Sequence, residues 1–155
     1  MAEKQYLYEL ELAVRDYELD LQGIVNNSNY QRYFEHARHE FLFSKGIDFA
    51  GLYLDGKDLV VVRIEIDYKF PLRSRDRFKV AVRIEREGSL KIVFDQAIFR
   101  IPDQKLIAAA KVYGVCLNHG RPVRPETVLD MKLLEAQQEK SKIKDPADAV
   151  MLKVT

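Results

Sequence analysis

Most of the chain alternates between apolar and polar residues with the two-residue period of a β-strand. The alternation is strict over residues 62–69 and 77–84, and near the N-terminus it runs over residues 8–14. Each of these segments predicts a strand with one face toward the core and the other toward water. Turn-forming residues between 71 and 76 further predict that the strands at 62–69 and 77–84 pair as an antiparallel hairpin.

Two later segments, residues 90–101 and 106–117, are apolar on both faces. Strands of this kind lie in the centre of a sheet, where both faces are covered. The connection between them contains Pro102, Asp103 and Gln104, which predicts a tight turn.

One segment has the period of a helix instead. From position 30 onward, apolar residues recur at intervals of three and four, as on one face of an amphipathic helix. Polar side chains at 26–28 can cap its first turn, and Gly46 can end it. The apolar stripe consists of Tyr30, Tyr33, Phe34, Ala37, Phe41 and Leu42.

A second, shorter helix is predicted over residues 125–140, with Pro125 in its first turn. Residues 141–155 are mostly polar and predict a C-terminal tail. The order of one strand, one long helix and four strands favours an α+β fold, in which one helix lies on an antiparallel sheet. We therefore expect a single domain over residues 1–140, followed by the tail.

The composition limits the partners. The 155 residues carry 25 Lys and Arg against 24 Asp and Glu, a net charge of +1, so no basic surface for nucleic acid is indicated. Apolar runs are far shorter than the ~20 residues that cross a bilayer, and the first residues lack the pattern of a signal peptide. A single cysteine, Cys116, cannot form an internal disulfide. We expect a cytoplasmic protein that neither binds nucleic acid nor inserts into a membrane.

The candidate chemistry gathers just before the long helix. Asp16, Glu18 and Asp20 precede Gly23 and the polar residues that open the helix. Backbone N–H groups at a helix start can bind the oxygen of a polarised carbonyl, while a nearby carboxylate attacks the carbonyl or activates water. On spacing alone, the same residues also fit a simple turn, in which Asp and Gly are common.

The motif D-x-x-G-I-V-x-x-x-N-Y, from Asp20 to Tyr30, resembles the hotdog-fold acyl thioesterases of the 4-hydroxybenzoyl-CoA thioesterase family. A second segment, from Asp67 to Asp76, also resembles this family. Within the family, residues 14–42 are most similar to the plant-type fatty acyl-ACP thioesterases. The resemblance covers residues 5–125. It implies a hotdog fold, in which an antiparallel sheet of five to six strands wraps around one long helix. It also implies a homodimer or a tetramer of two dimers, with the active sites at the dimer interface.

Carried over by position, the resemblance implies that Asp20 is the catalytic acid, acting as a nucleophile or as a general base. The backbone N–H of Asn27 would polarise the thioester carbonyl, and Gly23 would allow close approach of the chain. Many bacterial relatives carry His or Tyr in place of Asn27, whereas the plant-type subgroup carries Asn. Asp16 and Glu18 are not expected to be catalytic, and Glu18 could pair with a neighbouring Arg.

The substrate contacts implied by the resemblance belong to three regions: the motif, the turn before residue 77 and the turn before residue 91. Basic side chains in such turns could bind the phosphates of CoA or of a carrier protein's phosphopantetheine, although each also fits an ordinary solvated surface. Phenylalanines on the helix stripe could line an acyl tunnel or simply belong to the core. The substrate-binding residues expected are Val25, Tyr30, Glu35, Arg73, Ser89 and Lys91, with Arg75, Arg121 and Arg124 as further phosphate candidates.

The expected function is hydrolysis of an acyl-CoA or acyl-ACP thioester, with a fatty acyl group first, and no cofactor or metal. His36 and His39 have helical spacing but lack further metal ligands nearby, and no Gly-x-Ser-x-Gly motif is present. Three alternatives stay open: an aryl-CoA thioesterase, a hotdog acyl-thioester dehydratase or hydratase, and a non-catalytic acyl-CoA binding module. A dehydratase of this fold would use a His where Asn27 stands.

Overall fold

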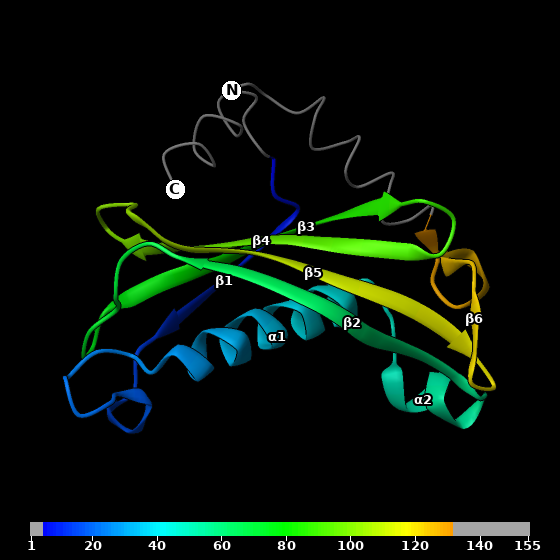
Figure 1. The fold of residues 1–155 in the computed structure, drawn as a ribbon, viewed down its shortest axis with the longest axis horizontal. Coiled ribbons are helices and arrows are strands. Elements are labelled where there is room, and N and C mark those ends of the chain that lie inside the picture. Colours follow the sequence, from blue (N-terminus) through cyan, green and yellow to red (C-terminus); the bar gives the residue numbers. More distant parts are fainter. Residues whose placement is uncertain (1–4, 132–155) are drawn as a thin grey trace.

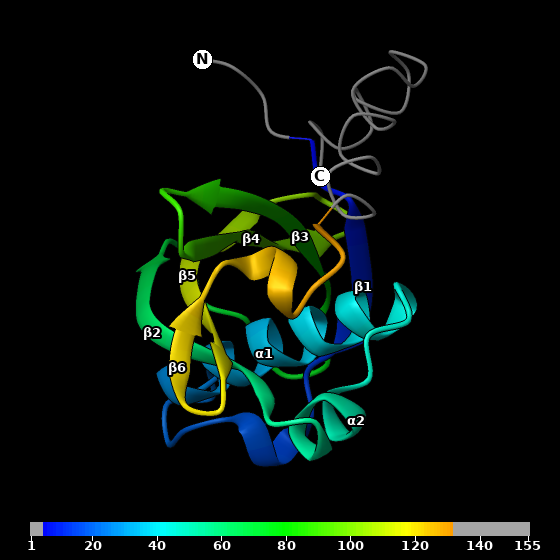
Figure 2. The same ribbon diagram turned by 90° about the vertical axis from the view of Figure 1, so that its right-hand side faces the viewer.

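A curved antiparallel sheet wraps around one long helix in the computed structural model, which describes residues 5–131 (Figure 1). The strands are β1 (Tyr8–Ala13), β2 (Lys57–Tyr68), β3 (Arg77–Glu87), β4 (Lys91–Ile101), β5 (Leu106–Asn118) and β6 (Arg121–Val123). Their order in the sheet is β1-β3-β4-β5-β2, and β6 pairs with the end of β5. Seen from the end, the strands form an arc with the helix on its concave side (Figure 2).

The helix inside the arc, α1 (Asn27–Ser44), is the predicted long helix. The side chain of Asn26 caps it by accepting a hydrogen bond from the Ser28 N–H, and Gly46 follows its end with a φ of +82°. Glycine adopts this left-handed backbone without strain, which explains why the helix ends there. All six residues of the predicted apolar stripe are buried, so both the helix and its core face are confirmed.

A buried polar pair fixes α1 on the sheet. The side-chain amide of Gln96 in β4 donates to the carbonyl of Phe34 at 3.0 Å and accepts from Arg38 Nη1 at 3.1 Å. Arg38 is only 6% exposed, and burial lowers the pKa of its guanidinium to about 10. An unsatisfied polar group in the core costs about 1–3 kcal/mol, so these bonds resist any sliding of α1 along the sheet.

The predicted hairpin between residues 62–69 and 77–84 is wrong. β2 pairs with β5, where Ile64 lies opposite Val112, and β3 lies between β1 and β4. The connecting segment does turn at residues 73–76, where the Asp76 N–H donates to the Arg73 carbonyl at 3.1 Å, but the turn does not join paired strands. The segment runs instead beside the loop that precedes α1, where the Leu72 carbonyl accepts from the Val25 N–H at 2.9 Å. Alternation identifies each strand, but it does not say which strands are neighbours.

The apolar face of β2 is also not buried within one chain, contrary to the prediction. Val62, Ile64 and Tyr68 are 51%, 39% and 47% exposed, and of the four apolar residues predicted to face the core only Ile66 is half-buried. α1 packs mainly on β3 and β1, and its first turn meets β2 at Tyr68. The strands predicted at β3, β4 and β5 are confirmed, and so is the central place predicted for β4 and β5.

Two helical predictions need correction. A short helix, α2 (Phe49–Leu54), is capped by the Asp48 side chain, and its six residues are too few to display a period in the sequence. The first six residues of the helix predicted over residues 125–140 are not α-helical: Pro125–Thr127 form a 3-10 turn, and residues 128–130 are not helical. Residues 132–140 of that predicted helix and the predicted tail at 141–155 lie outside the described residues. None of the helices in the described part of the chain is long and apolar enough to cross a membrane.

Candidate active site

The loop before α1, residues 16–26, folds into a small hydrogen-bonded structure that we call the Asp20 loop. After a 3-10 turn at Asp16–Glu18, it forms a tight hairpin in which the Asp20 N–H donates to the Ile24 carbonyl at 2.8 Å. At the tip, the N–H of Gly23 donates back to the Asp20 carbonyl at 3.1 Å, and Gly23 has a φ of +79°. A residue with a side chain would be strained in this conformation, so the hairpin depends on this glycine.

The carboxylate of Asp20 is half-buried and oriented by its own loop. Its Oδ1 accepts from the backbone N–H groups of Gln22 at 2.8 Å and Ile24 at 3.3 Å. No donor to Oδ2 is found within residues 5–131. One oxygen therefore holds the side chain in place, and the other is free to act on a substrate or a water molecule.

The start of α1 offers a hydrogen-bond donor next to this loop. The Asn26 side chain accepts from the Ser28 N–H at 3.0 Å, and the Asn26 carbonyl accepts from the Asn29 N–H at 2.9 Å. The N–H of Asn27 has no acceptor among the described residues. This orphan donor lies at the positive end of the helix dipole, which suits it to the oxygen of a polarised carbonyl.

A cleft of about 220 Å³ lies between the start of α1 and the end of β2. Tyr30 forms part of its wall: the Tyr30 hydroxyl accepts from the Leu72 N–H at 3.0 Å, and burial raises the pKa of Tyr30. The Tyr68 ring packs edge-on against Tyr30, with centroids 5.4 Å apart, and the Tyr68 hydroxyl donates to the Asn27 carbonyl at 3.5 Å. The cleft is lined by Ile24, Val25, Asn27, Tyr30, Tyr68, Lys69, Phe70 and Pro71.

This cleft brings together three of the residues expected in the site, Val25, Tyr30 and Asn27, and Asp20 is bonded to Ile24 on its rim. The sequence places Tyr68 on a buried strand face and in the second segment that resembles the family, and it does not predict that Tyr68 belongs to the site. Its place beside the helix start depends on where the end of β2 lies, which local periodicity does not reveal.

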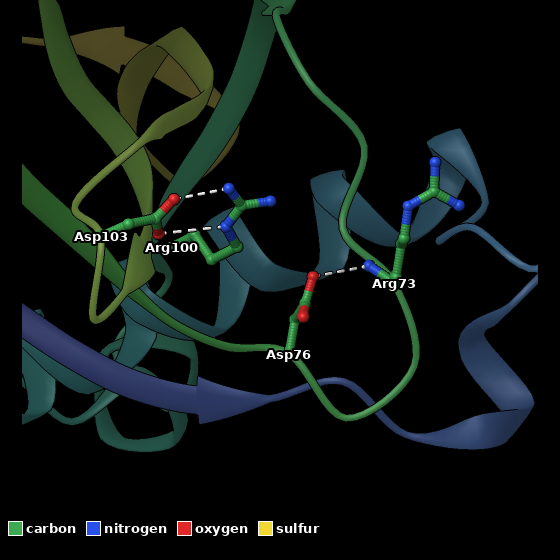
Figure 3. A network of polar contacts seen from close by, with 4 residues as sticks. All are labelled: Arg73, Asp76, Arg100 and Asp103. Atoms are coloured by element: carbon green, nitrogen blue, oxygen red, sulfur yellow. Dashed lines mark hydrogen bonds and ion pairs between the residues drawn. The ribbon is translucent and has the colours of Figure 1, made fainter.

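Arg73 lies in the turn that borders the Asp20 loop. Its backbone N–H donates to Asp76 Oδ2 at 2.9 Å, whereas its guanidinium points away from that carboxylate (Figure 3). Ile24 forms a β-bridge with Arg73, so the turn and the loop are joined. Nearby, the guanidinium of Arg100 donates two hydrogen bonds to the carboxylate of Asp103, which compensates its charge and lowers the pKa of Asp103. Within the described chain the Arg73 guanidinium has no such partner, and it remains available to an anion.

The other expected contacts are not brought to the cleft within one chain. Ser89 and Lys91 lie at the turn between β3 and β4, at the far end of β3 from Arg73. β3 has 11 residues, which corresponds to about 35 Å at about 3.3 Å per residue. Glu35 is exposed on α1 and does not line the cleft. The two phosphate candidates after β5, Arg121 and Arg124, are likewise remote in sequence and strand position from the Asp20 loop.

Two further expectations concern side chains outside the cleft. Phe34 and Phe41 are both fully buried in the core between α1 and the sheet. The exposed His36 and His39 belong to no cluster of three or more potential metal ligands in the part of the chain that the structure describes. The carboxylate of Glu18 accepts from the backbone N–H of Arg15, not from its guanidinium, which donates to the Tyr17 hydroxyl.

The family model of the thioesterase-like superfamily matches residues 14–142. The chain belongs to this superfamily. It is 45% identical over 118 residues to the chloroplastic acyl-acyl carrier protein thioesterase ATL3 of Arabidopsis thaliana, a match that covers 76% of this chain and 62% of ATL3. It is also 35% identical over 119 residues to a putative esterase of Aquifex aeolicus, covering 76% of this chain and 91% of that protein.

Among solved structures, the chain superimposes with a TM-score of 0.74 on a Thermus thermophilus thioesterase complexed with coenzyme A and Zn, at 26% identity, over 88% of this chain and 98% of that one. The hotdog fold and the resemblance to plant-type acyl-ACP thioesterases are thereby confirmed. The chain spans less than two thirds of the length of the plant relatives, 62% of ATL3 and 63% of ATL2.

Proposed function

We propose that this protein hydrolyses an acyl thioester to a free acid and a thiol. The proposal rests on two nearby groups that have no hydrogen-bond partner among residues 5–131: Oδ2 of Asp20 and the backbone N–H of Asn27, seven positions further along the chain. Thioester hydrolysis needs a group that attacks the carbonyl carbon or activates water, and a donor that stabilises the oxyanion. The Asp20 loop supplies the first of these groups and the start of α1 supplies the second, beside a largely apolar cleft.

The Asn27 N–H would donate to the thioester oxygen and draw electron density from the carbonyl carbon. In one route, Oδ2 of Asp20 attacks that carbon, the C–S bond breaks, and water then hydrolyses the mixed anhydride. In the other, Asp20 takes a proton from a water molecule whose oxygen attacks, and the departing thiolate receives a proton as the tetrahedral intermediate collapses. Gly23 keeps the loop tight enough for the thioester to approach.

The proposed substrate carries a fatty acyl group on phosphopantetheine, attached first to acyl carrier protein and second to CoA. The name of ATL3 supports the carrier-protein form, and the coenzyme A complex of the Thermus thermophilus neighbour supports the CoA form. The free guanidinium of Arg73, on the rim of the Asp20 loop, has the chemistry to contact a phosphate of either carrier.

We further propose that β2 is the edge along which two copies pair, giving a homodimer or a tetramer of two dimers. Val62, Ile64 and Tyr68 expose apolar surface along this edge, and the same surface runs into the cleft at Tyr68. A second copy would cover it, and could bring Ser89 and Lys91 of one subunit toward the cleft of the other. A cytoplasmic location stays an expectation from the sequence, since ATL3 and ATL2 are named as chloroplastic proteins.

The deciding experiment is a thiol-release assay over a panel of acyl-ACP and acyl-CoA thioesters, with the wild type and Asp20→Asn side by side. We expect turnover that depends on acyl length and falls by at least about 100-fold in Asp20→Asn, because the variant keeps the loop's acceptor oxygen but loses the carboxylate. Unchanged turnover in that variant would contradict the role of Asp20.

The panel also separates the alternatives. Preference for aroyl-CoA would indicate the aryl-CoA thioesterase, and reversible addition of water to an enoyl thioester would indicate a hydratase. Tight acyl-CoA binding without thiol release on any substrate would indicate the binding module and would contradict the proposed hydrolysis.

A further inference from the structure

Glu18, two residues before Asp20, accepts four hydrogen bonds that link both proposed catalytic groups to the core. Its Oε1 accepts from the backbone N–H of Arg15 and from the hydroxyl of Tyr33, each at 2.8 Å. Its backbone carbonyl accepts from the Asn26 N–H at 3.0 Å and from the side-chain amide of Asn29 at 2.8 Å. One residue thus bonds to the 3-10 turn, to the helix cap and to the second turn of α1.

The Tyr33 end of this arrangement is rigid. Tyr33 is 5% exposed, and its ring packs against Phe78 of β3 with centroids 4.7 Å apart, and edge-on against Tyr30 at 6.0 Å. Burial and the contact with the Glu18 carboxylate raise the pKa of Tyr33, so its hydroxyl remains a donor throughout the working pH range. A carboxylate that accepts from a fixed phenol is itself fixed, and charge-assisted bonds of this kind are stronger than neutral ones.

The Glu18 carbonyl fixes the other half of the site. By accepting from Asn26 and Asn29, it ties the loop to the residue just before Asn27 and to the residue two positions after it. The Asp20 loop and the helix start therefore cannot separate without breaking bonds to Glu18. The side chain of Glu18 is half-buried and lies in the wall of a second cleft, of about 360 Å³, on the β1 side of α1, away from the cleft beside Tyr68.

We propose that Glu18, held by Tyr33, is a positioning residue that sets the distance between the Asp20 carboxylate and the Asn27 N–H. This inference rests on the proposed function, since it assigns Glu18 a role in the same site. Glu18 does not touch the substrate. It acts through the two groups that do, and a small displacement of such groups can cost a large factor in rate.

The test compares Glu18→Ala, Glu18→Gln and Tyr33→Phe with Asp16→Ala, a matched loss of a carboxylate from the same 3-10 turn. In Glu18→Ala we expect kcat to fall about 10- to 100-fold while KM changes less than about threefold, because orientation is lost and binding is kept. Glu18→Gln should retain activity within about threefold, because its amide oxygen can still accept from Arg15 and Tyr33. Tyr33→Phe should fall between these two, and Asp16→Ala should resemble the wild type.

A second readout does not depend on activity. Amide hydrogen exchange in the wild type should protect the peptide covering residues 19–26, and Glu18→Ala should exchange faster there while β3 to β5 stay unchanged. Unaltered exchange and unaltered kcat in Glu18→Ala would overturn the positioning role. Equal losses of kcat in Glu18→Gln and Asp16→Ala would also overturn it, because they would show that the negative charge matters and not the hydrogen bonds that position the loop. If the wild type released no thiol, the proposed function would fail, and the exchange comparison would still decide whether Glu18 holds the loop.

Discussion

The two edges of the sheet are built from similar alternating sequences, yet only one of them is covered within the chain. At the β1 edge, apolar side chains pack on the core, with the Tyr8 ring 5.9 Å from Phe41, and the outer face carries an ion pair of 3.4 Å between Glu9 and Lys79. At the β2 edge, the apolar side chains stand open beside the cleft. The difference comes from α1, which packs mainly on β3 and β1 and meets β2 at Tyr68, near the start of the helix. A long apolar edge strand invites pairing with another chain, whereas a short one with charged residues resists it.

We expect the largest effect, on self-association, from a charged residue placed on the apolar face of β2. We expect Ile64→Lys to convert a dimer to a monomer and to weaken self-association by at least about 100-fold, because an interface that buries an unpaired ammonium loses several kcal/mol. Light scattering at micromolar concentration measures this. Asp67→Lys, on the opposite face of the same strand, is the control and should stay dimeric. A monomeric wild type, or a dimeric Ile64→Lys, would show that β2 is not the interface.

We expect a smaller effect, on the free energy of unfolding at high pH, from a tyrosine next to β1. Tyr6 precedes this strand, and burial raises its pKa to about 12, with a further contribution from Asp95. The folded-state pKa lies above the unfolded value, so its contribution to stability is complete below pH 10 and is lost as the pH rises toward 12. Between pH 9 and 11.5 the wild type should lose about 1–2 kcal/mol more unfolding free energy than Tyr6→Phe.

Urea denaturation at the two pH values measures this difference. Tyr53→Phe, which changes an exposed ring, should follow the wild type. Parallel pH curves for the wild type and Tyr6→Phe would mean that Tyr6 ionises as freely in the folded state as in the unfolded chain.

The smallest effect concerns the ion pair on the outer face of β1. Glu9→Gln should lower the unfolding free energy by less than about 1 kcal/mol, because partly exposed pairs contribute little and salt screens them. The loss should shrink further in 1 M salt, and the oligomeric state should not change. A loss of subunit association in Glu9→Gln would contradict the distinction between the two edges.

Strand and helix identity were predictable because the period of apolar residues is local. The partner of β2 was not, since pairing with β5 joins residues about 50 positions apart, such as Ile64 and Val112. The same limit explains why an alternating strand predicts an apolar face but not what covers it. A six-residue helix such as α2 has too few turns to show a period at all.

In the site, the motif from Asp20 to Tyr30 was enough to locate the loop and the helix start, because these residues are consecutive. The structure adds the bonds that orient them. The contact between Glu18 and Tyr33 spans 15 residues, and that between Tyr68 and Asn27 spans 41. Neither has a signature in the sequence, because each depends on how a separate element packs.

The bond from Gln96 to α1 ends on the backbone carbonyl of Phe34, so it survives any replacement of the Phe34 side chain. The distance of α1 from the sheet is therefore set by a bond to its backbone, whereas the volume between α1 and the sheet is set by side chains such as those of Phe34 and Phe41. A protein engineer can shorten Phe34 or Phe41 to enlarge the space under the helix, at a cost in folding stability, while the polar anchor keeps the helix start at its original level. The fold thus allows its interior to be resized without displacing the proposed catalytic residues at the start of the helix.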